Sequence, residues 1–66
     1  MQKNKIFEFR SHLGLTQRQL AEKVGILYQA LQRYEKGIVV PPVDMAIKIA
    51  RALQTSVELL FPLEEE

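Results

Sequence analysis

Cysteine is absent from this chain of 66 residues, and histidine occurs only once, as His12. These absences exclude disulfide bonds and thiolate metal sites, and one histidine cannot hold a metal ion by itself. No apolar run approaches the roughly 20 residues that a membrane-spanning helix needs, and the start of the chain lacks the apolar stretch of a signal peptide. We therefore expect a soluble, cytoplasmic protein that holds no metal ion or other cofactor.

Residue sets that are typical of enzymes are also absent. The sequence has no set of serine, histidine and acidic residues, no glycine-rich phosphate loop and no paired carboxylates suited to a cleft. A chain this short buries only about 60% of the surface that its unfolded form exposes, which leaves little interior for an enclosed active site. We therefore expect a protein that is not an enzyme and that binds no small molecule.

Charge is distributed unevenly along the chain. The net charge is +1, but three of the eight acidic residues occupy positions 64–66 at the end. Residues 1–63 therefore carry nine basic residues against five acidic ones, a net charge of +4. This excess permits an anionic partner without requiring one. We expect the acidic end to be a solvated tail.

Apolar residues recur at helical spacing along almost the whole chain, and only the short run at residues 38–40 suggests a strand. Gly14, Gly25 and Gly37 can each end a helix in the left-handed conformation. Thr16 can begin one, because Thr16 and Gln19 match a capping box. The pattern predicts an all-α fold in one domain, residues 1–66. The expected helices cover about residues 3–12, 17–24, 28–36, 43–53 and 57–61, with the acidic tail at 64–66.

The second and third expected helices are separated by little more than Gly25 and Ile26. Such a short connection favours a steep crossing of about 90 to 120°, as in a helix-turn-helix, over an antiparallel hairpin. This geometry gives the third helix an apolar inner side and a polar outer side. The inner side comprises Ile26, Ala30, Leu31 and Tyr34. The outer side comprises Tyr28, Gln29, Gln32, Arg33 and Lys36, with Leu27 at its N-terminal edge.

Three runs in this order, LGLTQRQLAEKVG, RYEKG and PPVDMAIKIARALQTSVELLF, resemble the Cro/repressor (Xre-type) helix-turn-helix family across about residues 5–61. The resemblance implies a lambda-repressor-like domain that binds double-stranded DNA with its third helix in the major groove. It also implies a salt bridge between Arg10 and Glu35 and a phosphate contact by Gln17. The positions that it implies for base contacts are Tyr28, Gln29, Gln32 and Arg33.

The chemistry of these side chains agrees with the implied roles. A glutamine amide can pair with adenine and a guanidinium with guanine, each through two hydrogen bonds that provide about 1 to 3 kcal/mol of discrimination. We expect Gln29 and Arg33 to be the main readers. The start of the second helix, near Gln17, offers backbone N–H groups to a phosphate, and Arg18 and Lys36 can add phosphate contacts.

Two positions depart from the family pattern. Leu27 stands where the family usually has a serine or threonine that caps the helix. A leucine cannot cap, which lowers the stability of the helix by on the order of 1 kcal/mol. A contact of Leu27 with DNA or with a partner would offset this loss. Residues 38–40 are apolar where relatives commonly contact phosphates, so they either pack inward or form a surface for another protomer. With fewer phosphate contacts, we expect a shallow salt dependence of DNA binding.

One domain of this size contacts only about 600 to 1,000 Å² of DNA, which favours a homodimer. Two third helices about 34 Å apart would read a near-palindromic operator, and the dimer would act as a repressor. The expected dimer interface is the apolar C-terminal segment with Val57, Leu60, Phe61 and Leu63. A second interpretation stays open: a protein-interaction module, antitoxin-like or partner-binding, with weak or no DNA binding. In that case the polar side of the third helix is simply a solvated face.

Overall fold

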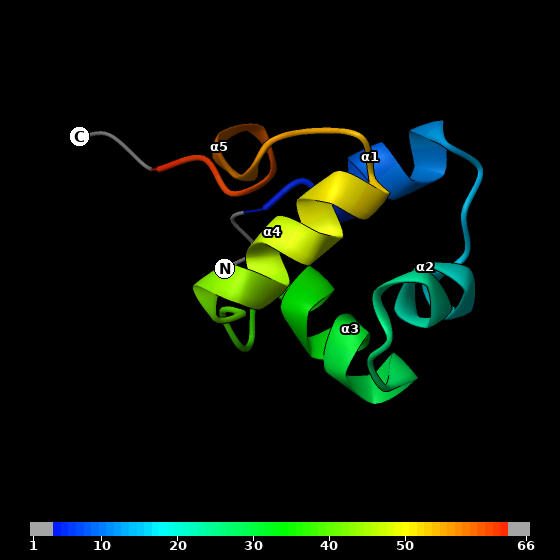
Figure 1. The fold of residues 1–66 in the computed structure, drawn as a ribbon. Helices are drawn as coiled ribbons and strands as arrows, with labels where there is room; N and C mark the ends of the chain where they lie inside the picture. Colours follow the sequence, from blue (N-terminus) through cyan, green and yellow to red (C-terminus); the bar gives the residue numbers. More distant parts are fainter. Residues whose placement is uncertain (1–3, 64–66) are drawn as a thin grey trace.

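The computed structural model describes residues 4–63 and contains helices but no strands in this range, so the expected all-α fold is confirmed. Residues 64–66, where the acidic tail was expected, lie outside the described range. The five helices, shown in Figure 1, are α1 (Ile6–His12), α2 (Gln17–Val24), α3 (Tyr28–Lys36), α4 (Val43–Ala52) and α5 (Val57–Leu60). No helix among these residues is long and apolar enough to cross a membrane.

The helices enclose one small aliphatic core. Helix α2 packs against α3 and α4, and α5 packs against α4. Each helix contributes at least one buried aliphatic side chain, as its helical spacing predicts. The largest fully buried side chains are Ile6, Leu20, Leu31, Ile49, Leu53 and Leu60.

Local hydrogen bonds fix the helix ends. The Thr16 hydroxyl accepts from the Gln19 N–H at 3.0 Å, and the Gln19 Oε1 accepts from the Thr16 N–H at 2.8 Å, which is the expected capping box. The first helix begins at Ile6, later than expected. Lys5 is in the cap position without a side-chain hydrogen bond, and the Asn4 Oδ1 before it accepts from the Ile6 N–H at 3.1 Å. The fourth helix ends at Ala52, one residue before the expected end.

Gly25 makes the turn between α2 and α3. It has φ 82°, in the left-handed region, and its N–H donates to the Ala21 carbonyl at 2.8 Å. The next residue, Ile26, donates to the same carbonyl and packs against the core, so the chain changes direction within three residues. Figure 1 shows α3 crossing α2 steeply rather than lying antiparallel to it. These two helices form the expected helix-turn-helix.

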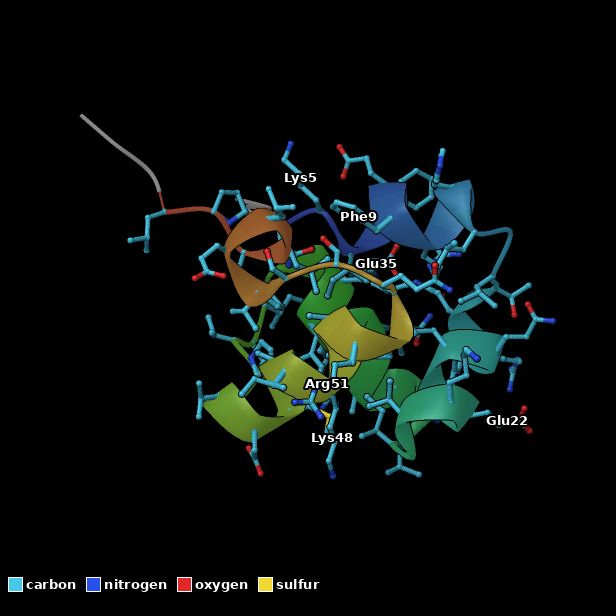
Figure 2. The ribbon with its side chains drawn as sticks, turned by 45° about the horizontal axis from the view of Figure 1, so that its top comes forward. Lys5, Phe9, Glu22, Glu35, Lys48 and Arg51 are labelled. Carbon is cyan, nitrogen blue, oxygen red and sulfur yellow. The ribbon has the colours of Figure 1, made fainter. Side chains whose placement is uncertain are left out.

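A polar network joins α1, α2 and α3. Arg10 and Glu35 form the expected ion pair, with Nη2 and Oε2 2.8 Å apart and the two side chains only 12% and 8% exposed. The Gln17 Nε2 donates to the other Glu35 oxygen at 2.9 Å, and the Arg10 Nη1 donates to the Leu15 carbonyl at 2.8 Å. Figure 2 shows Glu35 inside the molecule, whereas Glu22 projects into solvent. A carboxylate this buried needs such partners.

We expect Gly25→Ala to lower the free energy of unfolding by about 1 kcal/mol, because alanine is strained in the left-handed conformation. A Cβ built at this glycine meets no other atom within 4 Å apart from its chain neighbours, so a clash does not contribute. Gly25→Asn is the matched control, because asparagine tolerates this conformation and should lose less than half as much. Urea denaturation followed by circular dichroism measures both. Equal losses for the two variants would contradict this account.

We expect Arg10→Met to lower the free energy of unfolding by about 3 kcal/mol, because the Glu35 carboxylate would stay buried without its cation. The double variant Arg10→Met/Glu35→Leu removes both charges and should lose clearly less than Arg10→Met alone. The same denaturation experiment compares the two. A double variant that is no more stable than the single one would contradict this account, because neither variant contains the ion pair and only the single one keeps the unpaired carboxylate.

Candidate nucleic-acid interface

The outer side of α3 presents polar side chains to solvent, while its inner side is fixed in the core. Gln29, Arg33 and Lys36 are exposed, and Tyr28 and Gln32 are half-buried. On the inner side Leu31 is fully buried, and Ile26, just before the helix, packs against the core with Tyr34. A helix held along one side in this way carries the polar residues of its other side as one rigid unit.

The N-terminus of α3 has no side-chain cap. Leu27 occupies the cap position in an extended conformation and makes no side-chain hydrogen bond there. Its side chain is 74% exposed, at the edge of the polar side. The side chain of Leu27 therefore satisfies none of the first-turn N–H groups of α3, although the Leu27 carbonyl accepts from the Ala30 N–H at 3.1 Å. Leu27 is thus exposed, and the contact with DNA or with a partner that would offset the missing cap stays a prediction.

Gln17 lies at the start of α2, where a phosphate contact was expected. One N–H of its amide already donates to Glu35, which fixes the direction of the side chain. The second amide N–H and the backbone N–H groups of Gln17 and Arg18 are the donors that remain for an anion, because the Gln19 N–H already donates to Thr16. The phosphate contact of Gln17 stays a prediction, and the network now explains how the side chain is held.

Tyr28 contacts two other expected DNA-contacting residues. The guanidinium carbon of Arg18 lies 4.1 Å from the centre of the Tyr28 ring, within the range of a cation–π interaction. The Gln32 Nε2 donates to the Tyr28 hydroxyl oxygen at 3.1 Å. Sequence reasoning missed both contacts. The i, i+4 spacing of Tyr28 and Gln32 was a signal for the second contact, whereas ten residues separate Arg18 from Tyr28 in the sequence.

The loop after α3 is an exposed apolar segment. Ile38, Val39 and Val40 are 69%, 43% and 81% exposed, so inward packing of this segment is not what the structure contains. The segment has turns and bends rather than a strand. Of the two alternatives left open by the sequence, an apolar surface is therefore the one that the structure supports.

The C-terminal segment, expected at a dimer interface, is only partly exposed. Leu60 is fully buried under α4 in its own chain, so the expectation that it is exposed is wrong, because the core of so small a domain needs this side chain. Val57 and Phe61 are half-buried against the core, and Leu63 is 93% exposed. A groove of about 270 Å³ lies beside this segment. It is lined by Asn4, Gly37, Val39, Val40, Pro41, Phe61, Pro62 and Leu63.

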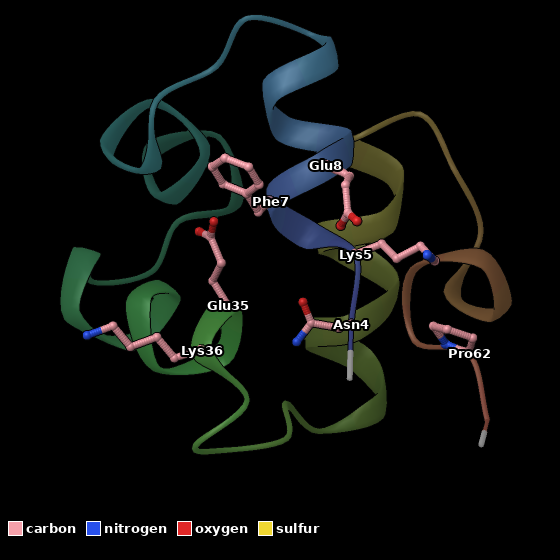
Figure 3. Close-up of a pocket in the computed structure, with 7 residues that line it drawn as sticks. All are labelled: Asn4, Lys5, Phe7, Glu8, Glu35, Lys36 and Pro62. Carbon is pink, nitrogen blue, oxygen red and sulfur yellow. The ribbon is translucent and has the colours of Figure 1, made fainter. Parts of the chain in front are cut away.

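A hollow beside the polar network is lined by residues of α1 and α3, among them Phe7, Glu8, Glu35 and Lys36. Figure 3 shows its lining, in which Glu35 points from α3 toward Phe7 of α1 and Lys36 points away from them. The Glu35 carboxylate is already held by Arg10 and Gln17. Among residues 4–63, no group of three or more histidine, cysteine or acidic side chains is placed to hold a metal ion.

Comparison with known proteins agrees with this geometry. A family model described as helix-turn-helix matches residues 6–60. The chain is 42% identical over 64 residues to the HTH-type transcriptional regulator YgzD of Bacillus subtilis (strain 168), covering 97% of both chains. It is 45% identical over 62 residues to an HTH-type transcriptional regulator of Methanothermobacter thermautotrophicus, covering 92% of this chain and 90% of that protein.

Two further relatives are named more specifically. The cryptic phage CTXphi transcriptional repressor RstR of Vibrio cholerae is 33% identical over 58 residues, which cover 88% of this chain and 52% of that protein. A solved structure of a SinR protein/SinI protein complex contains a chain that superimposes with a TM-score of 0.78 at 27% identity, covering 88% of this chain and 57% of that chain. The resemblance seen in the sequence is confirmed: the chain belongs to the helix-turn-helix family of transcriptional regulators and not to a family of enzymes.

Proposed function

We propose that the protein is a sequence-specific DNA-binding regulator that reads base edges with α3 in the major groove. The observation that carries the proposal is the polar outer side of a helix whose inner side is buried. Gln29 and Arg33 are exposed on this outer side, and their amide and guanidinium suit adenine and guanine. Gln32 and Tyr28 complete the set of candidate base contacts.

Phosphate contacts would position α3 in the groove. Gln17 and Arg18 lie at the start of α2, and Lys36 lies at the end of α3, so donors flank the reading residues at both ends. The apolar loop at residues 38–40 adds no donor side chains. Each neutralised phosphate contributes about −0.9 to the slope of log K against log salt, so few contacts per subunit give a shallow slope.

A homodimer on a near-palindromic operator would supply the affinity that a single domain lacks. Two copies of α3 about 34 Å apart would reach successive major grooves on one face of the DNA. A dimer bound at a promoter would exclude polymerase and repress transcription, and the relative RstR is named as a transcriptional repressor. The apolar surface available for the dimer is the groove beside Leu63 and the exposed Val40, rather than Leu60.

A partner-binding regulator is the second candidate function. Leu27, Ile38 and Val40 are exposed apolar side chains on and after α3, where a purely DNA-binding surface would gain from polar ones. The solved SinR protein/SinI protein complex is a structural relative in which the related chain was found with another protein. A mobility-shift assay with genomic and random DNA at low salt separates the two candidates, because a pure protein-interaction module shifts neither.

We expect Gln29→Ala and Arg33→Ala each to relax base preference at a different operator position by about tenfold, because each removes a pair of hydrogen bonds. Selection of bound fragments from a random DNA pool measures the preference. Arg51→Ala is the matched control, because it removes an exposed arginine from α4 and should leave the preference unchanged. Figure 2 shows Arg51 on α4, next to Lys48. Unchanged profiles for both α3 variants would overturn the assignment of the reading residues.

We expect Leu63→Glu to raise the dissociation constant of the dimer at least about tenfold, because each buried leucine contributes about 1.5 to 3 kcal/mol. Leu59→Glu is the control, because Leu59 is 60% exposed on α5 and does not line the groove. Sedimentation equilibrium measures the dissociation constant. A wild-type monomer at high micromolar concentration, or equal effects of the two substitutions, would contradict the proposed interface.

A further inference from the structure

Three side chains from two helices meet at the start of α3. Arg18 comes from the first turn of α2, and Tyr28 and Gln32 come from successive turns of α3. We propose that Tyr28 is a positioning residue: its hydroxyl sets the orientation of the Gln32 amide for base readout, and its ring holds Arg18 for a phosphate contact. This inference rests on the proposed DNA-binding function and states which residue orients the side chains that contact DNA.

The Tyr28 hydroxyl can orient the Gln32 amide because the two groups share a hydrogen bond. A glutamine on a helix surface samples many rotamers, and fixing one costs conformational entropy when the side chain binds. The Gln32 Nε2 donates one N–H to the Tyr28 oxygen at 3.1 Å, which fixes the amide before DNA arrives. The second N–H and the Gln32 Oε1 do not take part in this bond. One donor and one acceptor in the same plane are what the major-groove edge of adenine pairs with.

The Tyr28 ring can hold Arg18 because the guanidinium lies over it. The Arg18 guanidinium carbon lies 4.1 Å from the centre of the Tyr28 ring, and a guanidinium held over a ring keeps the N–H donors at its edge available. Arg18 also lines a hollow at the N-terminus of α2 together with Arg10, Gln17 and Tyr28. A helix N-terminus favours an anion through its backbone N–H groups. The stack thus holds the Arg18 donors next to the place where a phosphate would sit.

Both contacts use the same tyrosine, so the base-reading and phosphate-binding parts of the interface meet in Tyr28. The two parts can be separated chemically. Tyr28→Phe removes the hydroxyl and keeps the ring, so it releases Gln32 and leaves Arg18 stacked. Tyr28→Leu removes the ring as well, so it releases both partners. A tyrosine that reads a base directly would not show this division.

The first experiment needs no DNA. The side-chain amide resonances of Gln32, measured by NMR on the free protein, should shift in Tyr28→Phe and their amide protons should exchange faster with water. Tyr34→Phe is the matched control, because it removes the other tyrosine hydroxyl of the chain from the inner side of α3. Unchanged Gln32 resonances in Tyr28→Phe would overturn the hydroxyl half of the proposal.

The second experiment measures base preference and salt dependence of DNA binding. We expect Tyr28→Phe to weaken preference about threefold to tenfold at the same operator position as Gln32→Ala, because an unfixed amide must be ordered on binding. The double variant Tyr28→Phe/Gln32→Ala should lose no more base preference than Gln32→Ala alone. The salt slope of Tyr28→Phe should equal that of the wild-type protein. Tyr28→Leu and Arg18→Ala should each reduce the slope by about 0.9, one phosphate contact, and their double variant should reduce it no further.

The outcomes distinguish this inference from the proposed function. Suppose that the wild-type protein selects a DNA sequence and that Gln29→Ala relaxes its base preference, while Tyr28→Phe changes the preference at no operator position. In that case the proposed function stands and the role of the Tyr28 hydroxyl is wrong. If Tyr28→Leu leaves the salt slope unchanged while Arg18→Ala reduces it, the ring role is wrong. If the wild-type protein selects no sequence, both the proposed function and this inference are overturned.

Discussion

The buried carboxylate of Glu35 is the group on which the arrangement of the first three helices depends. A charged oxygen pair this far from water is tolerated only if each oxygen has a strong donor. Arg10 from α1 satisfies one oxygen, and Gln17 from the start of α2 satisfies the other. Because Glu35 lies near the end of α3, this one carboxylate joins three helices whose buried side chains also share one core.

This network matters for function because it connects the frame of the domain to its surface. Gln17 belongs both to the network and to the first turn of α2, where phosphates are expected to bind. The guanidinium of Arg18, the next residue in the sequence, lies over the ring of Tyr28, the first residue of α3. The start of α2 is therefore tied to both ends of α3: through Gln17 to Glu35 and through Arg18 to Tyr28. A docking helix held at both ends keeps the geometry that base readout requires.

Local features were predictable from the sequence, and tertiary ones were not. The capping box at Thr16 and the turn at Gly25 were readable because their chemistry lies within a few residues. The start of α1 was expected near residue 3, but the helix begins at Ile6, whose N–H donates to the Asn4 side chain, and apolar spacing does not reveal such a contact. Leu60 was expected at a dimer interface because the C-terminal segment is unusually apolar, yet it is fully buried in the core of its own chain. The Arg18–Tyr28 stack depends on how two helices cross, and no spacing rule encodes that.

The N-terminus of α3 lacks a side-chain cap, and this affects how its first backbone N–H groups are satisfied. Leu27 supplies no side-chain oxygen to the first turn, and its carbonyl accepts only from N–H groups further along the helix, those of Ala30 and Leu31. The far end, by contrast, is closed by Gly37 and anchored by Glu35. The two ends of this helix therefore differ in their hydrogen bonding, and an anion placed at the N-terminal end would supply the acceptor that the side chain of Leu27 lacks.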